Sequence, residues 1–176
     1  MDGQDNKERV RAAMAAVDRA AFVPEEWRWA AGEDRPLPIG YGQTVSQPYT
    51  VARMLELLGS GGRVLEVGTG SGWQTAILAR LFDKVYSVEI IPQLAREAKF
   101  RLQKLKLKNV KIKVGDGKKG WKRYAPYDGI IVAADADEVP PALVSQLAEG
   151  GRMVIPVRGE MLKIEKHGRF VFVPLV

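Results

Sequence analysis

The feature that most constrains the fold is a regular alternation of short apolar segments with amphipathic ones in the middle of the chain. Strands are expected at 63–67, 84–88, 110–114, 128–133 and 152–157. Helices are expected between them at 71–81, 92–105 and 140–148, the last ending at Gly150-Gly151. Strands that alternate with helices predict an α/β fold with a Rossmann-like, doubly wound and mostly parallel sheet.

The flanking segments are expected to be less regular. At the N-terminal end we expect a helix at 6–20, an irregular stretch rich in proline and glycine at 21–47, and a helix from Pro48 to Leu58. Proline suits the first turn of a helix because its missing N–H would have no partner there. At the other end, 161–165 and 169–175 are expected to form an antiparallel hairpin around His167-Gly168, at one edge of the sheet.

The composition excludes several kinds of chemistry. The 176 residues include no cysteine and a single histidine, His167. Disulfides, iron–sulfur clusters, cysteine nucleophiles and cysteine zinc sites are therefore excluded. No segment approaches the roughly 18 apolar residues of a membrane-spanning helix, and the polar start of the chain does not resemble a secretory signal. We therefore expect a cytoplasmic protein that does not associate with membranes.

Positive charge is concentrated in one segment. Between Lys99 and Arg123 lie eleven basic residues and one acidic residue, Asp116, in a chain whose net charge is +6. Such a segment is either a nucleic-acid-binding surface or a solvated helix face followed by a lysine-rich edge strand. No interleaved pattern of basic and aromatic residues suited to base stacking is present before Trp121. We therefore favour the solvated face and do not expect nucleic-acid binding.

A glycine-rich loop connects the first core strand to the helix that follows. It reads Gly68-Thr69-Gly70-Ser71-Gly72, with the spacing G-x-G-x-G. This spacing differs from the G-x-G-x-x-G loop of nicotinamide-binding proteins and from the lysine-containing phosphate-binding loop. In an open α/β sheet, ligands bind at the carboxyl ends of the strands, where the strand order reverses. Glycines there allow the backbone to approach a ligand closely.

Two further strands end in residues suited to a nucleoside. Glu89 ends the second core strand, in the position from which a carboxylate accepts hydrogen bonds from ribose hydroxyls. Asp116 and Gly117 follow the third strand, where an adenine ring would lie. Taken singly, Glu89 could cap a helix and Asp116 could stabilise a turn. However, the glycine loop, Glu89 and Asp116-Gly117 all lie at the same end of the sheet, and together they favour an adenosine pocket. We interpret Glu66, inside the first strand, as a structural carboxylate that accepts hydrogen bonds from N–H groups of the glycine loop.

These motifs resemble those of the protein-L-isoaspartate O-methyltransferase family. The most specific is Pro36–Tyr49, PLPIGYGQTVSQPY, and Val64–Thr75, VLEVGTGSGWQT, resembles the family's cofactor loop. The resemblance extends from about Phe22 to Leu175. It implies a single methyltransferase domain, 1–176. We divide this domain into an N-terminal helical, substrate-side segment (1–60), a cofactor-binding core (61–157) and a C-terminal hairpin (158–176).

The resemblance implies an enzyme that repairs damaged proteins. It would transfer a methyl group from S-adenosyl-L-methionine to the carboxylate of L-isoaspartyl residues in proteins and peptides, leaving S-adenosyl-L-homocysteine. By position, the catalytic residues are Ser46 and Thr44, and the substrate side includes Gln43, Gln47, Pro48 and Asp135. The residues implied to bind or support the cofactor are Glu66, Gly68, Thr69, Gly70, Ser71, Gly72, Glu89, Asp116 and Gly117.

The residue types present are compatible with this reaction. An isoaspartyl carboxylate, with a pKa near ~4, is already anionic at neutral pH. A sulfonium methyl group is already activated, so we expect neither a general base nor a metal ion. The protein then has to orient the reacting groups. The Ser46 hydroxyl and the N–H groups at the start of the Pro48 helix are expected to hold the acceptor, because helix N-termini bind anions.

The loop after the fourth core strand departs from the family's pattern. It contains Asp135 and Asp137, where family members usually have no acidic residues. If these carboxylates face the site, they would repel an anionic acceptor. We interpret Asp137 as the cap of the 140–148 helix and Asp135 as solvated.

Two other functions stay open from the sequence alone. The chain could methylate a different acceptor such as RNA, which the basic segment would suit, or an amine oriented by Asp135. However, no N-P-P-Y-like motif follows the fourth strand. The chain could also be a cofactor-binding relative without activity, but the intact Pro36–Tyr49 segment argues against this. We expect a monomer.

Overall fold

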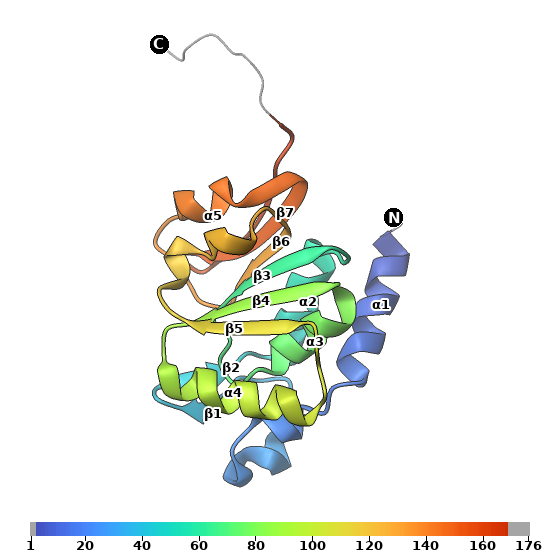
Figure 1. Ribbon diagram of the computed structural model, residues 1–176. Helices are drawn as coiled ribbons and strands as arrows, with labels where there is room; N and C mark the ends of the chain where they lie inside the picture. Colours follow the sequence, from blue (N-terminus) through green and yellow to red (C-terminus); the bar gives the residue numbers. More distant parts are fainter. Residues whose placement is uncertain (1–2, 169–176) are drawn as a thin grey trace.

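The centre of the molecule is a six-stranded sheet with the strand order β5-β4-β3-β6-β7-β8 (Figure 1). The computed structural model describes residues 3–168. The strands are β3 (Arg63–Val67), β4 (Lys84–Glu89), β5 (Val110–Val114), β6 (Tyr127–Val132), β7 (Leu147–Val157) and β8 (Glu160–Glu165). Neighbouring strands are parallel except β7 and β8, which are antiparallel. The predicted fold class, including an antiparallel hairpin at one edge, is confirmed.

The strand order reverses between β3 and β6. β3 pairs with β4 on one side and with β6 on the other, and each half of the sheet then continues outward. At such a reversal the connections leave in opposite directions, which opens a crevice at the carboxyl ends of the strands. The glycine loop follows β3 and therefore lies at this crevice.

Helices cover the two faces of the sheet unequally. One face packs against α1 (Gly3–Ala15), α2 (Pro48–Leu58), α3 (Trp73–Leu81) and α4 (Pro92–Lys104) (Figure 1). The other packs against short elements, namely α5 (Pro141–Ser145) and the 3-10 turns η3 (Gly117–Lys119) and η4 (Lys122–Tyr124). Successive strand residues point to opposite faces, so Val64 belongs to the first core and Leu65 to the second. Within residues 3–168, no helix is long and apolar enough to span a bilayer.

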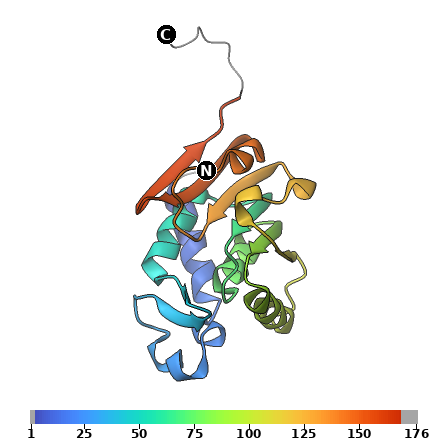
Figure 2. The ribbon, with the colours of Figure 1, turned by 90° about the vertical axis from the view of Figure 1, so that its left-hand side faces the viewer.

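The segment between α1 and α2 contains a small hairpin at the end of the molecule opposite β7 and β8 (Figures 1 and 2). It is made of β1 (Leu37–Gly40) and β2 (Gln43–Val45), preceded by the 3-10 turns η1 (Arg19–Phe22) and η2 (Glu25–Ala30). The proline and glycine content of 21–47 predicts an irregular stretch, and this prediction misses the hairpin. Strands of four and three residues are too short to show the alternation that identifies a strand. The helix expected at 6–20 is α1 followed, after a break, by η1.

One prediction for the C-terminal part is wrong, and another cannot be compared with the described residues. The helix expected at 140–148 is only α5, and β7 begins at Leu147 and continues through Gly150-Gly151. A Cβ atom on Gly151 would lie 3.0 Å from the carbonyl oxygen of Tyr127, so this glycine permits a close approach of β7 to β6. β8 pairs with β7 through a turn at Arg158-Gly159, a hairpin that the sequence did not predict. The other predicted arm, 169–175, lies outside the described residues.

Candidate active site at the carboxyl ends of the central strands

The loops that follow the central strands are joined by backbone hydrogen bonds where they leave the sheet. The N–H of Gly68 donates to the carbonyl oxygen of Val88 (2.9 Å), and the N–H of Ala133 donates to that of Val67 (2.8 Å). The loop after β5 is joined to β4 in the same way. The sheet ladder therefore extends into the loops and holds the predicted ligand-binding turns next to one another.

The glycine loop takes a conformation that side chains would disfavour. Gly68 and Gly70 have φ angles of +93° and +54°, which residues with a Cβ atom rarely adopt. A Cβ atom on Gly70 would lie 3.4 Å from Cδ1 of Ile39 in β1. A Cβ atom on Gly72 would lie 3.1 Å from Cβ of Ala98 in α4. The loop is thus closely packed between the β1–β2 hairpin and α4.

Glu89 ends β4 with its buried carboxylate bonded to the glycine loop. Its Oε2 accepts from the N–H of Gly70 (2.8 Å) and its Oε1 from the N–H of Ile91 (2.9 Å). A carboxylate offers about four lone-pair positions, so this group keeps capacity for further donors. The Ser71 hydroxyl nearby is also buried and has no hydrogen-bond partner among residues 3–168. These two observations fit a site that takes a polar ligand with hydroxyl groups.

Glu66 supports the glycine loop through other side chains. The prediction that it accepts hydrogen bonds from backbone N–H groups of the loop is therefore wrong. Its carboxylate accepts from Gln74 Nε2 (3.1 Å), from the Thr75 hydroxyl (2.5 Å) and from the Ser87 hydroxyl (2.6 Å). The Ser87 hydroxyl in turn shares a hydrogen bond with that of Thr69 in the glycine loop. Complete burial raises the pKa of Glu66 to about 7, against the lowering effect of these three hydrogen bonds. Glu66 therefore contacts the loop only indirectly.

Asp116 and Gly117 lie where the loop after β5 begins. The exposed Asp116 carboxylate accepts from the N–H of Lys118 (2.9 Å) and so caps η3. This is the turn-stabilising role that the sequence left as an alternative, and it leaves other lone pairs of the carboxylate free. A Cβ atom on Gly117 would overlap Cγ1 of Val67, so glycine is needed for this loop to lie against the end of β3.

Ser46 and the glycine loop line the same small cavity, of about 40 Å³. The predicted site residues that line it are Thr44, Ser46, Thr69, Gly70 and Ser71, with Trp73 and Gln74 from the start of α3 beside them. The fold thus brings together two motifs that are separate in the sequence. Larger hollows elsewhere, such as one of about 420 Å³ between Phe22 and Phe100, contain none of the predicted site residues.

The start of α2 is occupied by a side chain that the sequence analysis missed. Pro48 opens the helix as predicted, but the carboxylate of Asp34 accepts from the N–H of Tyr49 (2.8 Å) and from Nε2 of Gln47 (3.0 Å). The hydrogen bond from Gln47, and then that from Tyr49, lower the pKa of Asp34. The expectation that these N–H groups are free to hold the acceptor is therefore wrong for Tyr49. Gln43, the other predicted substrate-side glutamine, is exposed in β2.

The two acidic residues after β6 do not face this cavity. The exposed Asp135 accepts from the N–H of Gly159 (3.0 Å), in the turn between β7 and β8. Asp137 does not cap α5, whose N-cap residue is Pro140, with no side-chain cap. The predicted cap fails because α5 begins only at Pro141, too far along the chain.

The basic segment is partly engaged within the molecule. β5 is an edge strand, as the lysine-rich pattern predicts. Lys111 donates to the Tyr124 hydroxyl (3.2 Å), Lys113 donates to the carbonyl oxygen of Gly120 (2.9 Å), and Arg101 pairs with Glu97 on α4. These contacts favour the interpretation as a solvated surface.

Comparisons with known proteins point to one enzyme family. The family model described as protein-L-isoaspartate(D-aspartate) O-methyltransferase matches residues 2–171. A protein-L-isoaspartate O-methyltransferase of Halorhodospira halophila is 54% identical over 168 residues, covering 92% of this chain and 76% of the relative. One of Myxococcus xanthus is 51% identical over 175 residues, covering 96% of this chain and 82% of the relative.

Two solved structures share the fold over nearly the whole chain. A protein-L-isoaspartate O-methyltransferase superposes with a TM-score of 0.81 and 30% identity, covering 93% of this chain and 57% of that one. A Plasmodium falciparum protein assigned to the same enzyme class was solved in complex with S-adenosyl-L-homocysteine. It superposes with a TM-score of 0.75 and 28% identity, covering 90% of this chain and 82% of that one. The family match over residues 2–171 and the relatives above half identity show that this chain belongs to the protein-L-isoaspartate O-methyltransferase family.

Proposed function

We propose that the cavity between Ser46 and the glycine loop is where this chain methylates damaged proteins. The reaction moves a methyl group from S-adenosylmethionine to the free carboxylate of an L-isoaspartyl residue, which begins the return of that residue to aspartate through a succinimide. The observation that carries the proposal is the shared cavity, because it joins the family's acceptor motif to its cofactor loop. Family membership supports the choice of substrate.

The strand-end loops are proposed to hold the cofactor. When bound, S-adenosylmethionine supplies a methyl group already activated by the positive sulfur. The backbone at Gly68 and Gly70 would lie against its methionine part, and Glu89 would accept from the ribose hydroxyls with its remaining lone pairs. Asp116 and Gly117 would lie on the adenine side. The Plasmodium falciparum protein solved with S-adenosyl-L-homocysteine supports the choice of cofactor.

Ser46 and Thr44 are proposed to orient the acceptor. The acceptor carboxylate is ionised at neutral pH, so no residue has to remove a proton from it before transfer. What the protein contributes is alignment of the carboxylate oxygen with the methyl group and the leaving sulfur. Because Asp34 already accepts from the N–H of Tyr49, we assign the main contact to the hydroxyl of Ser46, a residue that borders the cavity.

The proposal is tested by transfer of labelled methyl from S-adenosylmethionine. The acceptors are an isoaspartyl peptide, the same peptide with a normal aspartyl residue, and bulk tRNA. We expect base-labile label, as in a methyl ester, on the isoaspartyl peptide only. Label on tRNA would support the alternative acceptor, and cofactor binding without label on any acceptor would support a relative that has lost transfer. Either result overturns the proposal.

Two further expectations belong to the proposal and depend on separate measurements. A cytoplasmic location is expected for a repair enzyme of intracellular proteins, and cell fractionation would test it. A monomer is expected as well. Light scattering of the purified protein would test the oligomeric state.

A further inference from the structure

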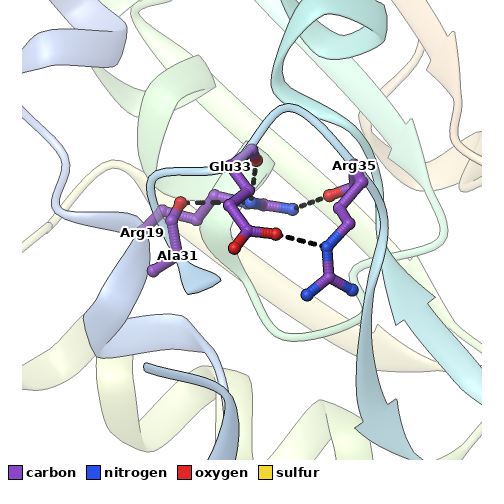
Figure 3. Close-up of polar contacts among 4 residues, drawn as sticks. All are labelled: Arg19, Ala31, Glu33 and Arg35. Atoms are coloured by element: carbon purple, nitrogen blue, oxygen red, sulfur yellow. Dashed lines mark hydrogen bonds and ion pairs between the residues drawn. The ribbon is translucent and has the colours of Figure 1, made fainter. Parts of the chain in front are cut away.

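The side chain of Arg19 joins four backbone positions around the predicted acceptor site. Arg19 begins η1 and is 6% exposed. Its Nη1 donates to the carbonyl oxygens of Ala31 (3.1 Å) and Glu33 (3.1 Å), and its Nη2 donates to those of Arg35 (2.9 Å) and Ser46 (3.1 Å). Figure 3 shows the first three of these bonds closing the loop around the guanidinium group.

Burial of the charged guanidinium group of Arg19 costs free energy. We therefore expect this side chain to do more than fill space. Burial of the guanidinium lowers the pKa of Arg19, and the charge of Asp34 partly opposes that effect. Among residues 3–168, no carboxylate accepts a hydrogen bond from Arg19. An apolar side chain could fill the same volume without desolvating a charge. What only arginine supplies is a planar set of donors that fixes several carbonyl groups at once.

Arg19 also contacts the cofactor side of the cavity. Its guanidinium lies over the ring of Trp73, with 5.2 Å between Cζ and the ring centroid. Trp73 is the first residue of α3, directly after the glycine loop, and it lines the same cavity as Ser46. The ring is fixed in turn by a hydrogen bond from its Nε1 to the carbonyl oxygen of Val17 (3.3 Å). One side chain therefore contacts both the backbone of Ser46 and the residue that follows the glycine loop.

The loop held by Arg19 includes the residue that caps α2. Asp34 lies between Glu33 and Arg35, whose carbonyl groups both accept from Arg19. Its carboxylate accepts from Nε2 of Gln47, the residue directly after Ser46, and from the N–H of Tyr49. The loop is thus attached to the Ser46 region at two points, one through Arg19 and one through Asp34.

We propose that Arg19 is a positioning residue for methyl transfer, which sets the distance between Ser46 and the glycine loop. The inference rests on the proposed function. Arg19 does not touch the reacting atoms; it acts through the carbonyl group of Ser46 and through the loop that carries Asp34. Because transfer depends on alignment of the acceptor with the methyl group, a small displacement of Ser46 lowers the rate strongly.

The first test compares Arg19→Met and Arg19→Lys with Arg53→Met, a matched control on the exposed side of α2. We expect kcat for an isoaspartyl peptide to fall by about 10–100-fold in both Arg19 variants. The Kd for S-adenosyl-L-homocysteine should change by less than about threefold, because the strand-end loops stay in place. Lysine keeps the charge but places its donors on one nitrogen, so it cannot reproduce the four bonds. Full activity in Arg19→Lys, or an equal loss of cofactor affinity, would overturn the proposal.

The second test separates positioning from a loss of stability. Hydrogen exchange of Arg19→Met should accelerate in 31–46 and stay unchanged in β3 and β6. Adding tens of millimolar guanidinium to Arg19→Ala should restore part of kcat, whereas ammonium at the same concentration should not. Faster exchange throughout the sheet, or a failure of guanidinium to raise kcat in a folded variant, contradicts the inference. If the wild-type chain binds cofactor but methylates no isoaspartyl peptide, the proposed function fails, and exchange in 31–46 still decides whether Arg19 orders the loop.

Discussion

The cofactor side and the acceptor side of the cavity are held in place by different kinds of bond. On the cofactor side, backbone groups at the ends of β3, β4 and β6 bond to one another as an extension of the sheet, and the Glu89 carboxylate adds a bond to the N–H of Gly70. On the acceptor side, the loop before β1 and the start of α2 are held by two charged side chains, Arg19 and Asp34. A sheet positions its loops through its register, whereas the acceptor side depends on a few side-chain contacts.

This difference implies that the two sides can be disturbed separately. A change in the glycine loop should remove cofactor binding and leave the acceptor loop ordered. A change at Ser46 should lower the rate of transfer and leave cofactor affinity unchanged. Any variant that impairs both sides equally would show that the two are coupled more tightly than their bonding suggests.

The largest effect is expected from Gly70→Val. Valine is strained at a φ of +54°, and its Cβ atom would already lie 3.4 Å from Ile39, before its methyl groups are added. We expect binding of S-adenosyl-L-homocysteine, measured by calorimetry, to fall below detection. In Gly32→Ala, where a Cβ atom has nothing within 4 Å, affinity should be unchanged. Normal affinity in Gly70→Val would place the cofactor elsewhere.

The next largest effect is expected from Ser46→Ala. Loss of one positioning hydrogen-bond donor should lower the rate of methyl transfer by about 10–1000-fold. Cofactor affinity should hardly change, because Ser46 lies on the acceptor side. Above pH ~5 the wild-type rate should show no ionisation attributable to a catalytic base, since the acceptor carboxylate is already charged. Ser145→Ala, which removes a hydroxyl bonded within α5, is the matched control. An unchanged rate in Ser46→Ala would remove this residue from the mechanism.

A smaller effect is expected on the stability of the protein, and it comes from Glu66 on the cofactor side. Burial raises the pKa of Glu66 from its usual 4.5 to about 7, so the folded state binds a proton more readily than the unfolded state between these values. The free energy of unfolding should therefore fall as pH rises from 4.5 to 7, by roughly 3 kcal/mol from this group, and then level off. Chemical denaturation at several pH values should show this slope in the wild type and a weaker one in Glu66→Gln. Equal slopes in the two proteins would show that Glu66 does not titrate in this range.

The difference in bonding between the cofactor side and the acceptor side also explains how much of the structure could be predicted. Gly68, Glu89 and Gly117 follow strands with clear apolar patterns, so the sheet places them without knowledge of their side-chain contacts. Asp34 stands in a stretch without periodicity and Arg19 near the end of the helix expected at 6–20, and nothing in either neighbourhood distinguishes these residues from solvated charges. Their partners are mostly backbone carbonyl and N–H groups, which leave no signal in the sequence. The helix expected at 140–148 is wrong because the Gly150-Gly151 pair, which is typical of a helix end, lies inside β7.

The smallest effect is expected from Asp135→Ala. From the sequence alone, a carboxylate after the fourth core strand could repel an anionic acceptor, and its removal would then raise the affinity for the isoaspartyl peptide. In the structure this carboxylate accepts from the N–H of Gly159 and does not line the cavity with Ser46. We therefore expect the KM for the peptide to stay within about twofold of the wild type, and the change in stability to stay near ~0.5 kcal/mol, as for most exposed positions. Asp137→Ala, in the same loop, is the matched control and should behave alike. A tenfold fall in KM for Asp135→Ala alone would mean that the loop turns toward the acceptor when peptide binds. Complete loss of transfer would mean that Asp135 acts on the acceptor itself, and an amine would then be a better substrate than a carboxylate.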